Sequence, residues 1–284
     1  MPTTSVLVLT HDRDEHLLRQ ADSLQHTQGC DAAAGRGWDE VVVTFVNQDT
    51  EPWEFPPDGV RTQHLEAEGL ALAAGRNASA RAARAQDEDV LVFLDVDCLA
   101  EPTTVATLAA DCRPGRLVMA SPCYLPPGWA PPSDPSSVAI PHPSREGLGS
   151  GPSADWHMFW SLGFAITAGD FWRVGGFDED YRGYGGEDTD FAFRCRDAGM
   201  HFFLSPARVL HQAHAVHRPP LHHFASIVTN ARRFHQRWGR WPMEGWLDAF
   251  AARGLLRIDG DELVVLREPT VDEVAATHQP TARF

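Results

Sequence analysis

The chain has 284 residues and a mass of 31.3 kDa, the size of one large α/β domain or two small ones. Its formal net charge of −15 disfavours binding to phosphate backbones and anionic lipids, so we expect neither a nucleic-acid partner nor peripheral membrane binding. All 24 basic residues are Arg, which excludes Schiff-base chemistry and a P-loop lysine.

The cysteines and the hydrophobic segments indicate a reducing, cytoplasmic setting. The five Cys contain no C-x-x-C pair, so neither a zinc knuckle nor a disulfide framework is indicated. The first 14 residues lack the basic region of a signal peptide. No apolar run approaches the ~20 residues of a membrane span.

The first third of the chain alternates short apolar runs with helical segments. We predict buried strands at 5–9, 41–46 and 90–94, and helices at 15–25 and 70–85. This alternation favours a parallel sheet with crossover helices. Each strand runs into a polar loop, and ligands of such sheets bind at the carboxyl ends of the strands.

The segment 122–152 contains nine of the 21 prolines, and we expect a long, mobile loop without regular elements there. Order is predicted to resume in strands and helices at 161–167, 170–174, 187–198, 200–204 and 226–238. The tail is expected to hold a short helix and a hairpin at Asp259-Gly260, and its last dozen residues are candidates for disorder.

Two carboxylates, Asp95 and Asp97, follow the predicted strand 90–94 directly. Carboxylates one residue apart at a strand end can reach a hard divalent cation and a nucleotide together. A solvated strand end would carry the same pattern, but the buried run before it favours the functional interpretation.

A second group of carboxylates follows paired glycines, in Gly185-Gly186-Glu187-Asp188 and then Asp190. Paired glycines allow a ligand to approach the backbone, and they open a helix whose first turn is acidic. The simpler interpretation is that these charges complement the helix dipole. The aromatic residues around the motif instead favour sugar recognition, with one carboxylate as a general base.

A third group consists of His211, His214 and His217, spaced by three residues in a region that holds seven of the 14 histidines. Taken singly, each of these histidines is more typical of a surface or core position than of a metal ligand. A pair at i and i+3 after a strand can complete a metal site begun by a carboxylate.

Several strings carry a resemblance to a known family. FLDVDCLAEP (93–102), the run 161–200 around GGFDEDYRGYGGEDTD, and VLHQAH (209–214) resemble the GT-A nucleotide-sugar glycosyltransferases. The similarity extends both to the large bacterial inverting family and to the C-terminal catalytic domain of the β-1,4-galactosyltransferases. THDRDEHLL (10–18) resembles the first nucleotide loop of the latter, and the match spans about 5–234 without 122–152.

The resemblance implies roles for individual residues. Asp97 matches the metal-binding carboxylate, with His211, His214 or both as further metal ligands. Asp188 matches the catalytic base, and Glu187 matches the sugar contact beside it. The residues expected to contact the donor are Arg13, Asp49, Arg76, Asp95, Tyr184 and Gly186. Tyr184 stands where the galactosyltransferases carry a Trp, so this sequence departs from the pattern at that position.

The implied protein is a single GT-A domain over 1–238, with a mostly parallel mixed sheet flanked by helices, followed by a C-terminal helical extension and tail over 239–284. Its implied activity is inverting, metal-dependent transfer of a sugar from a nucleoside-diphosphate sugar, with UDP as the expected nucleotide, to an acceptor hydroxyl. Mn²⁺ or Mg²⁺ is the implied cofactor.

Two alternatives compete with this interpretation. A phosphatase of the haloacid-dehalogenase kind also ends a buried strand in D-x-D. That chemistry usually needs Thr or Val where Leu99 stands and a Lys that this chain lacks. A degenerate, carbohydrate-binding transferase without turnover is the other alternative. The joint presence of Asp97, Glu187, Asp188 and His211 argues against it.

Overall fold

The computed structural model describes residues 2–29, 35–145, 147 and 149–283. The helices are α1 (Asp14–Gln25), α2 (Leu72–Ala82), α3 (Thr104–Asp111), α4 (Ala168–Arg173), α5 (Glu187–Asp197), α6 (Phe224–Trp238), α7 (Glu244–Ala251) and α8 (Val271–Ala276). Short 3-10 turns lie at η1 (Pro135–Ser137), η2 (Pro143–Arg145), η3 (Trp156–Met158) and η4 (Leu221–His223).

The main sheet has the strand order β3-β2-β1-β4-β9-β6-β10-β5. Its strands are β1 (Thr4–Thr10), β2 (Glu40–Val46), β3 (Val60–Leu65), β4 (Val90–Leu94), β5 (Cys98–Ala100), β6 (Arg116–Tyr124), β7 (Ile140–Pro141), β8 (Gly151–Ser153), β9 (Gly163–Thr167) and β10 (His201–His211). The pairs β1–β2, β1–β4, β2–β3 and β6–β10 are parallel, whereas β9 runs antiparallel to both β4 and β6. The sheet is therefore mixed, as the resemblance to the GT-A glycosyltransferases implies, whereas the alternation of strands and helices alone favoured a parallel sheet.

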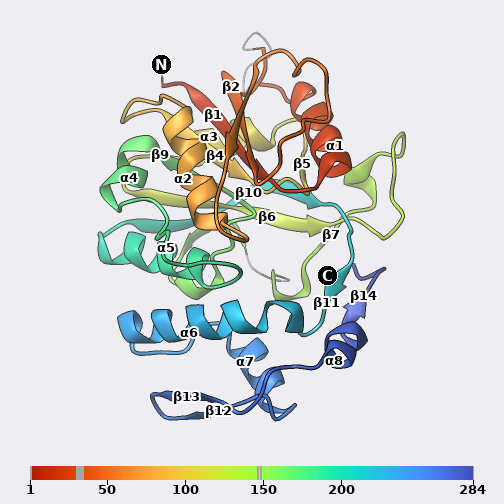
Figure 1. Ribbon diagram of the computed structural model, residues 1–284. Coiled ribbons are helices and arrows are strands. Elements are labelled where there is room, and N and C mark those ends of the chain that lie inside the picture. The colour runs from red at the N-terminus through yellow and green to blue at the C-terminus, as the bar shows by residue number, and fades with distance from the viewer. Residues whose placement is uncertain (1, 30–34, 146, 148, 284) are drawn as a thin grey trace.

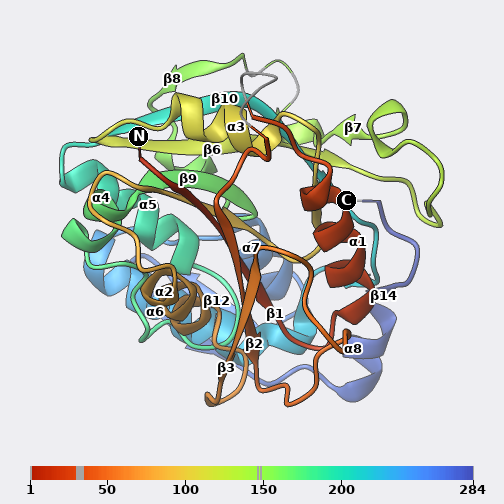
Figure 2. The same cartoon turned by 90° about the horizontal axis from the view of Figure 1, so that it is seen from above.

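Helices cover both faces of the sheet, because successive side chains of a strand point to opposite faces. Val6 and Val8 pack with α1 and α3, whereas Leu7 packs with α2, α4 and α5 on the other side. Figure 2 shows α1 and α3 on one side of the sheet and α2, α4 and α5 on the other. None of the described helices combines the length and the apolar character that crossing a bilayer takes.

The C-terminal segment forms a further layer beneath the sheet (Figure 1). It contains α7, α8, the hairpin of β12 (Leu256–Asp259) with β13 (Glu262–Val265), and β14 (His278–Gln279), which pairs with β11 (Val216–His217). Phe224 and Ile227 of α6 share one apolar core with Leu247 and Phe250 of α7. The two sides of the predicted boundary at 238 are thus packed together.

The structure corrects three sequence-based expectations. The Pro-rich segment 122–152 is partly regular, because β7 pairs with β6 and β8 pairs with β10; residues 146 and 148 lie outside the described part. The last dozen residues are partly ordered, because β14 has a strand partner. The strand expected at 200–204 continues to His211, because its second half pairs with both β6 and β5.

Candidate functional site

The turn after β4 is fixed by hydrogen bonds to its backbone. The buried side chain of Gln20 donates from Nε2 to the carbonyl oxygens of Asp95 (2.7 Å) and Cys98 (2.8 Å). The Cys98 N–H also donates to the Asp95 carbonyl at 2.9 Å. With the turn held in this way, β5 pairs antiparallel with the end of β10, and Cys98 lies opposite His211. This register brings Asp97 next to the histidines.

Asp97, His211 and His214 form a three-residue cluster. Nε2 of His211 lies 3.5 Å and Nε2 of His214 lies 3.3 Å from Oδ2 of Asp97. Their donor atoms all lie within 4.8 Å of one another. Nδ1 of His214 hydrogen-bonds to the Ala215 carbonyl at 2.9 Å, which keeps its Nε2 directed at the cluster. One carboxylate oxygen and two imidazole nitrogens make a donor set that suits Mn²⁺-like divalent cations.

The electrostatics of this cluster favour an ionised carboxylate. Burial opposes ionisation of Asp97, but His211 and His214 outweigh it and hold the pKa of Asp97 well below its usual range. Burial lowers the pKa of His211, whereas the hydrogen bond to Asp97 raises the pKa of His214. The Nδ1 of His211 is buried without a hydrogen-bond partner in the described structure. The residues present therefore fit a bound divalent cation.

Arg76 connects the two groups of carboxylates. Its side chain, 4% exposed, donates from Nη2 to Asp95 and from Nη1 to Glu187, each at 3.1 Å. Burial raises the pKa of Asp95 to about 6, although Arg76 counteracts it. Asn77 donates from Nδ2 to the Phe177 carbonyl and accepts from the Phe177 N–H, both at 2.8 Å, which ties the Gly-rich loop to α2. The Arg-Asn step thus holds Glu187 opposite Asp95.

Asp188 is the carboxylate of this site that forms no ion pair with a described Arg or His side chain. Its Oδ1 accepts from the backbone N–H (2.6 Å) and the hydroxyl (3.2 Å) of Thr189, and it has no ion-pair partner among the described residues. Burial, and then the negative charge of Glu187, raise the pKa of Asp188 to about 7. Gly186, with φ 91°, begins α5 immediately before these carboxylates. A carboxylate with this pKa can accept a proton near neutral pH.

Two aromatic rings stack against Tyr184. The ring stacks against His223 at a centroid distance of 4.7 Å and against Trp246 of α7 at 5.6 Å. Burial and the charges of Glu187 and Asp188 raise the pKa of its hydroxyl well above the usual value. The Tyr184 hydroxyl is therefore close enough to the two carboxylates to feel their charge, while its ring packs against His223 and Trp246.

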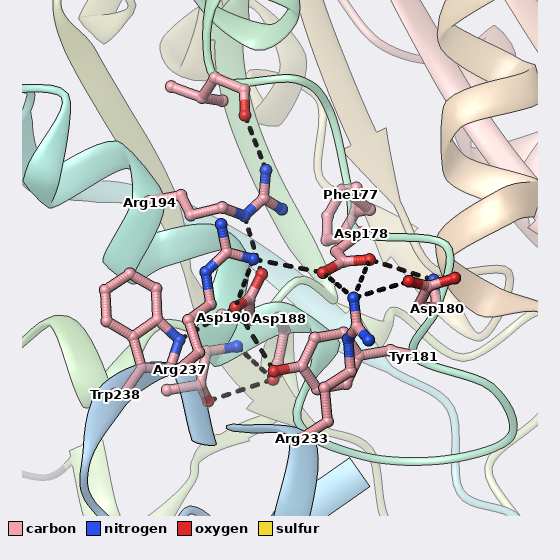
Figure 3. A network of polar contacts seen from close by, with 12 residues as sticks. Phe177, Asp178, Asp180, Tyr181, Asp188, Asp190, Arg194, Arg233, Arg237 and Trp238 are labelled. Carbon is pink, nitrogen blue, oxygen red and sulfur yellow. Dashed lines mark hydrogen bonds and ion pairs between the residues drawn. The ribbon is translucent and has the colours of Figure 1, made fainter. Parts of the chain in front are cut away.

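Asp190 lies at the centre of the polar network in Figure 3. Its side chain is fully buried and accepts from Arg194 Nε (2.8 Å) and Trp238 Nε1 (2.9 Å), with Tyr181 Oη at 3.4 Å. Arg237 also lies 3.4 Å from Asp190, and it bonds to Asp178 as well. This network fastens the first turn of α5, which carries Glu187 and Asp188, to the end of α6.

We expect Asp190→Ala to lower the free energy of unfolding by about 3 kcal/mol, because it leaves the guanidinium of Arg194 without its buried partner. Urea denaturation measures this change. Asp197→Ala on the same helix, which breaks an exposed pair with Arg196, is the matched control and should cost at most about 1 kcal/mol. Equal effects of the two substitutions would contradict a central role for Asp190.

The two loop residues predicted to contact the donor differ in position. Arg13 is half-buried at the start of α1, near enough to the cluster for its positive charge to add to burial in lowering the pKa of His211. Its guanidinium has no hydrogen bond or ion pair within the described ranges. Asp49 is exposed on the loop after β2, where its charge acts on His64.

The third histidine of the predicted group lies apart from the three-residue cluster. His217 hydrogen-bonds to Thr277 at 2.9 Å and belongs to the C-terminal layer.

Three residues that support the site had no recognisable signal in the sequence. Gln20 holds the turn after β4. Gln48 joins the first two loops by accepting from the Asp12 N–H at 2.9 Å and donating to Asp14 at 2.8 Å. His16 lies beside His214 with a ring-centroid distance of 6.0 Å. They were missed because single polar residues on a helix or in a loop form no motif of their own.

Comparisons with known sequences identify glycosyltransferases. Residues 142–221 match a family model described as the N-terminal domain of galactosyltransferase. The chain is 30% identical over 235 residues to validoxylamine A glucosyltransferases from Streptomyces hygroscopicus subsp. limoneus and subsp. jinggangensis, with 72% of the chain covered in each case. The chain spans about half the length of these curated relatives, 50% and 54% respectively.

Solved structures with the same fold include GalNAc-T7 with UDP, GalNAc and Mn²⁺ (TM-score 0.52, 18% identity, covering 74% of this chain and 43% of that one). TarS of S. aureus in complex with UDP-GlcNAc is similar with a TM-score of 0.53 and 12% identity, over 74% of this chain and 58% of that one. These likenesses show the GT-A fold. Together with the sequence matches, they confirm the resemblance to GT-A glycosyltransferases.

Proposed function

Starting from this likeness to GT-A glycosyltransferases, we propose that the chain transfers a sugar from a nucleoside-diphosphate sugar to an acceptor hydroxyl, with inversion at the sugar carbon. The observation that carries the proposal is the metal-ligand cluster of Asp97, His211 and His214 at the turn after β4, in the same site as Glu187 and Asp188. A UDP-sugar is the proposed donor, supported by the nucleotides in the two similar structures. The catalytic domain is proposed to span 1–238, with 239–284 as its extension.

The metal-ligand cluster would hold Mn²⁺ or Mg²⁺ through Asp97, His211 and His214. When bound, the cation would neutralise charge that develops on the departing nucleoside diphosphate. Arg13 lies near the same position and would contact the diphosphate. Asp95, held by Arg76, would accept hydrogen bonds from the nucleotide-sugar, with Gly186 and the Tyr184 hydroxyl lining the sugar position. Asp49 is proposed as a nucleoside contact on the second loop.

Asp188 is the proposed base. Direct displacement with inversion needs one carboxylate on the face opposite the leaving group to accept the proton of the acceptor hydroxyl. Glu187 forms an ion pair with Arg76. It is therefore better suited to orienting a sugar than to accepting a proton. The pKa of Asp188, raised to about 7 by burial, suits this carboxylate to accept a proton near neutral pH.

The pH dependence of kcat/KM follows from this assignment. A base must be deprotonated before it can act, so we expect kcat/KM to rise with pH up to about 7 and to level off above it. The profile is measured with saturating metal ion. In Asp188→Asn the limb near pH 7 should disappear from the residual activity, whereas a limb retained there would assign the ionisation to another group, such as Asp95.

A ligand panel tests the proposed function as a whole. Thermal unfolding is measured with UDP, other nucleoside diphosphates and their sugars, with and without Mn²⁺. A ligand at a hundredfold excess over its Kd stabilises the fold by about 2.7 kcal/mol. We expect stabilisation by a uridine diphosphate compound that depends on Mn²⁺, together with slow hydrolysis of the matching sugar donor. No stabilisation by any nucleotide would contradict the proposal.

A further inference from the structure

The inner face of α1 covers the turn that carries Asp95 and Asp97. Gln20 on this face donates to the Asp95 and Cys98 carbonyls, and Leu17 and Leu24 are buried in the core. His16 precedes Gln20 by four residues, so both side chains project from the same side of the helix. The helix thus directs His16 toward the metal-ligand cluster.

Two contacts fix the position of His16 at this cluster. Its backbone carbonyl accepts from Gln212 Nε2 at 3.2 Å, which ties α1 to the segment between the two cluster histidines. Its ring lies edge-on to His214, with the planes at 80° and the centroids 6.0 Å apart. The charged and titratable groups that act on the ring are Asp97, Arg13, His214 and Arg19.

The imidazole of His16 has no hydrogen bond to any described residue, and its Nε2 is buried. A buried polar atom without a partner costs free energy, so such atoms in native proteins usually meet a ligand or water. Asp97 is not the missing partner, because no hydrogen bond or ion pair joins it to His16 in the described structure; its Oδ2 faces His211 and His214. The metal-ligand cluster does not include His16 either.

The surroundings of His16 favour an anionic partner. Arg13, one turn earlier, lies near enough for its positive charge to act on His16, and it makes no ion pair within the described chain. The two carboxylates of the first turn of α1 are engaged elsewhere, Asp14 by Gln48 and Glu15 by Arg19. The start of a helix of 12 residues adds its own positive end. A phosphate oxygen next to the metal ion matches all of these features.

We propose that His16 binds the diphosphate of the nucleotide, donating a ring N–H to a phosphate oxygen beside the metal ion. This inference rests on the proposed function, because it assumes a nucleoside-diphosphate ligand. His16 is then a binding residue on α1, separate from the three cluster residues. Together with Arg13 it would form the α1 side of a diphosphate site next to Asp97, His211 and His214, the residues that would hold the cation.

The test compares ligand affinities of two variants by calorimetry, using UDP with Mn²⁺ and Mn²⁺ alone as probes. His16→Phe keeps the ring size and removes both nitrogens, and His16→Gln restores an N–H near the position of Nε2. We expect His16→Phe to raise the Kd for UDP at least about tenfold and His16→Gln to recover part of the loss. The Kd for Mn²⁺ alone should stay within about threefold.

His26→Phe is the matched control, since it lies directly after the same helix and is exposed. It should leave both affinities unchanged. An unchanged Kd for UDP in folded His16→Phe would overturn the inference, and so would an equal loss of affinity for Mn²⁺ alone, which would make His16 part of the metal site. If the unsubstituted chain fails to bind UDP with Mn²⁺, the proposed function itself is wrong.

Discussion

Replacing Asp188 by Asn should reduce turnover by about 10²–10⁴-fold while donor affinity stays within a few-fold. Asn keeps the size of the side chain and can still accept the hydrogen bonds from Thr189 through its amide oxygen. The substitution removes the basic lone pair that would take the proton from the hydroxyl of the acceptor substrate. The measurements are the transfer rate at saturating substrates and the Kd of the donor.

The neighbouring carboxylate supplies the comparison. Glu187→Gln weakens the contact with Arg76, so it should change KM together with kcat instead of removing a proton acceptor. Near-normal turnover in Asp188→Asn together with a collapse in Glu187→Gln would mean that the base is Glu187. Thermal unfolding of both variants tests whether the loss of turnover is chemical or follows from a loss of stability.

Replacing Asp97 by Ala should abolish Mn²⁺-dependent nucleotide binding while the protein stays folded. The substitution removes the only carboxylate of the metal-ligand cluster and leaves two imidazoles with reduced affinity for a hard cation. The metal Kd is measured by calorimetry, and the nucleotide Kd is measured with and without Mn²⁺. Unchanged metal affinity would contradict the assignment of this site.

Two controls separate binding from folding in this experiment. Asp22→Ala removes an exposed carboxylate of α1, 77% accessible, and should leave metal affinity unchanged. Circular dichroism of Asp97→Ala tests whether the fold survives. We expect it to survive, because the turn is held by Gln20 through backbone carbonyls and not through the Asp97 side chain.

The sequence predicted the sheet well where apolar runs were bounded by polar loops. β1, β2 and β4 are confirmed nearly to the residue, because buried parallel strands have no polar face to obscure them. β3, with the sequence VRTQHL, was missed because it lies at the edge of the sheet and only its first residue is fully buried. β5 has three residues and becomes a strand only by pairing with β10.

The site could be predicted only as far as motifs define it. Asp97, His211 and His214 are close in the structure, but the reason is the β5–β10 register, which no local pattern encodes. Arg76 was selected by resemblance, and its buried contacts with Asp95 and Glu187 give the physical basis. His16 depends on the placement of α1 against a turn some eighty residues later, a tertiary contact that helical periodicity alone does not reveal. The roles of all these residues remain predictions.

The stacking of Tyr184 with His223 and Trp246 also constrains how this chain can be engineered or can diverge. Trp246 packs in the same apolar core as Leu247 and Phe250, so the side chain that supports Tyr184 also supports the C-terminal layer. Substitutions at Tyr184 or Trp246 should therefore lower stability more often than substitutions at solvent-facing positions. Because residues 223 and 246 both stack against residue 184, we expect a chimera that takes its C-terminal segment from a relative to fold stably only if these three residues are exchanged together.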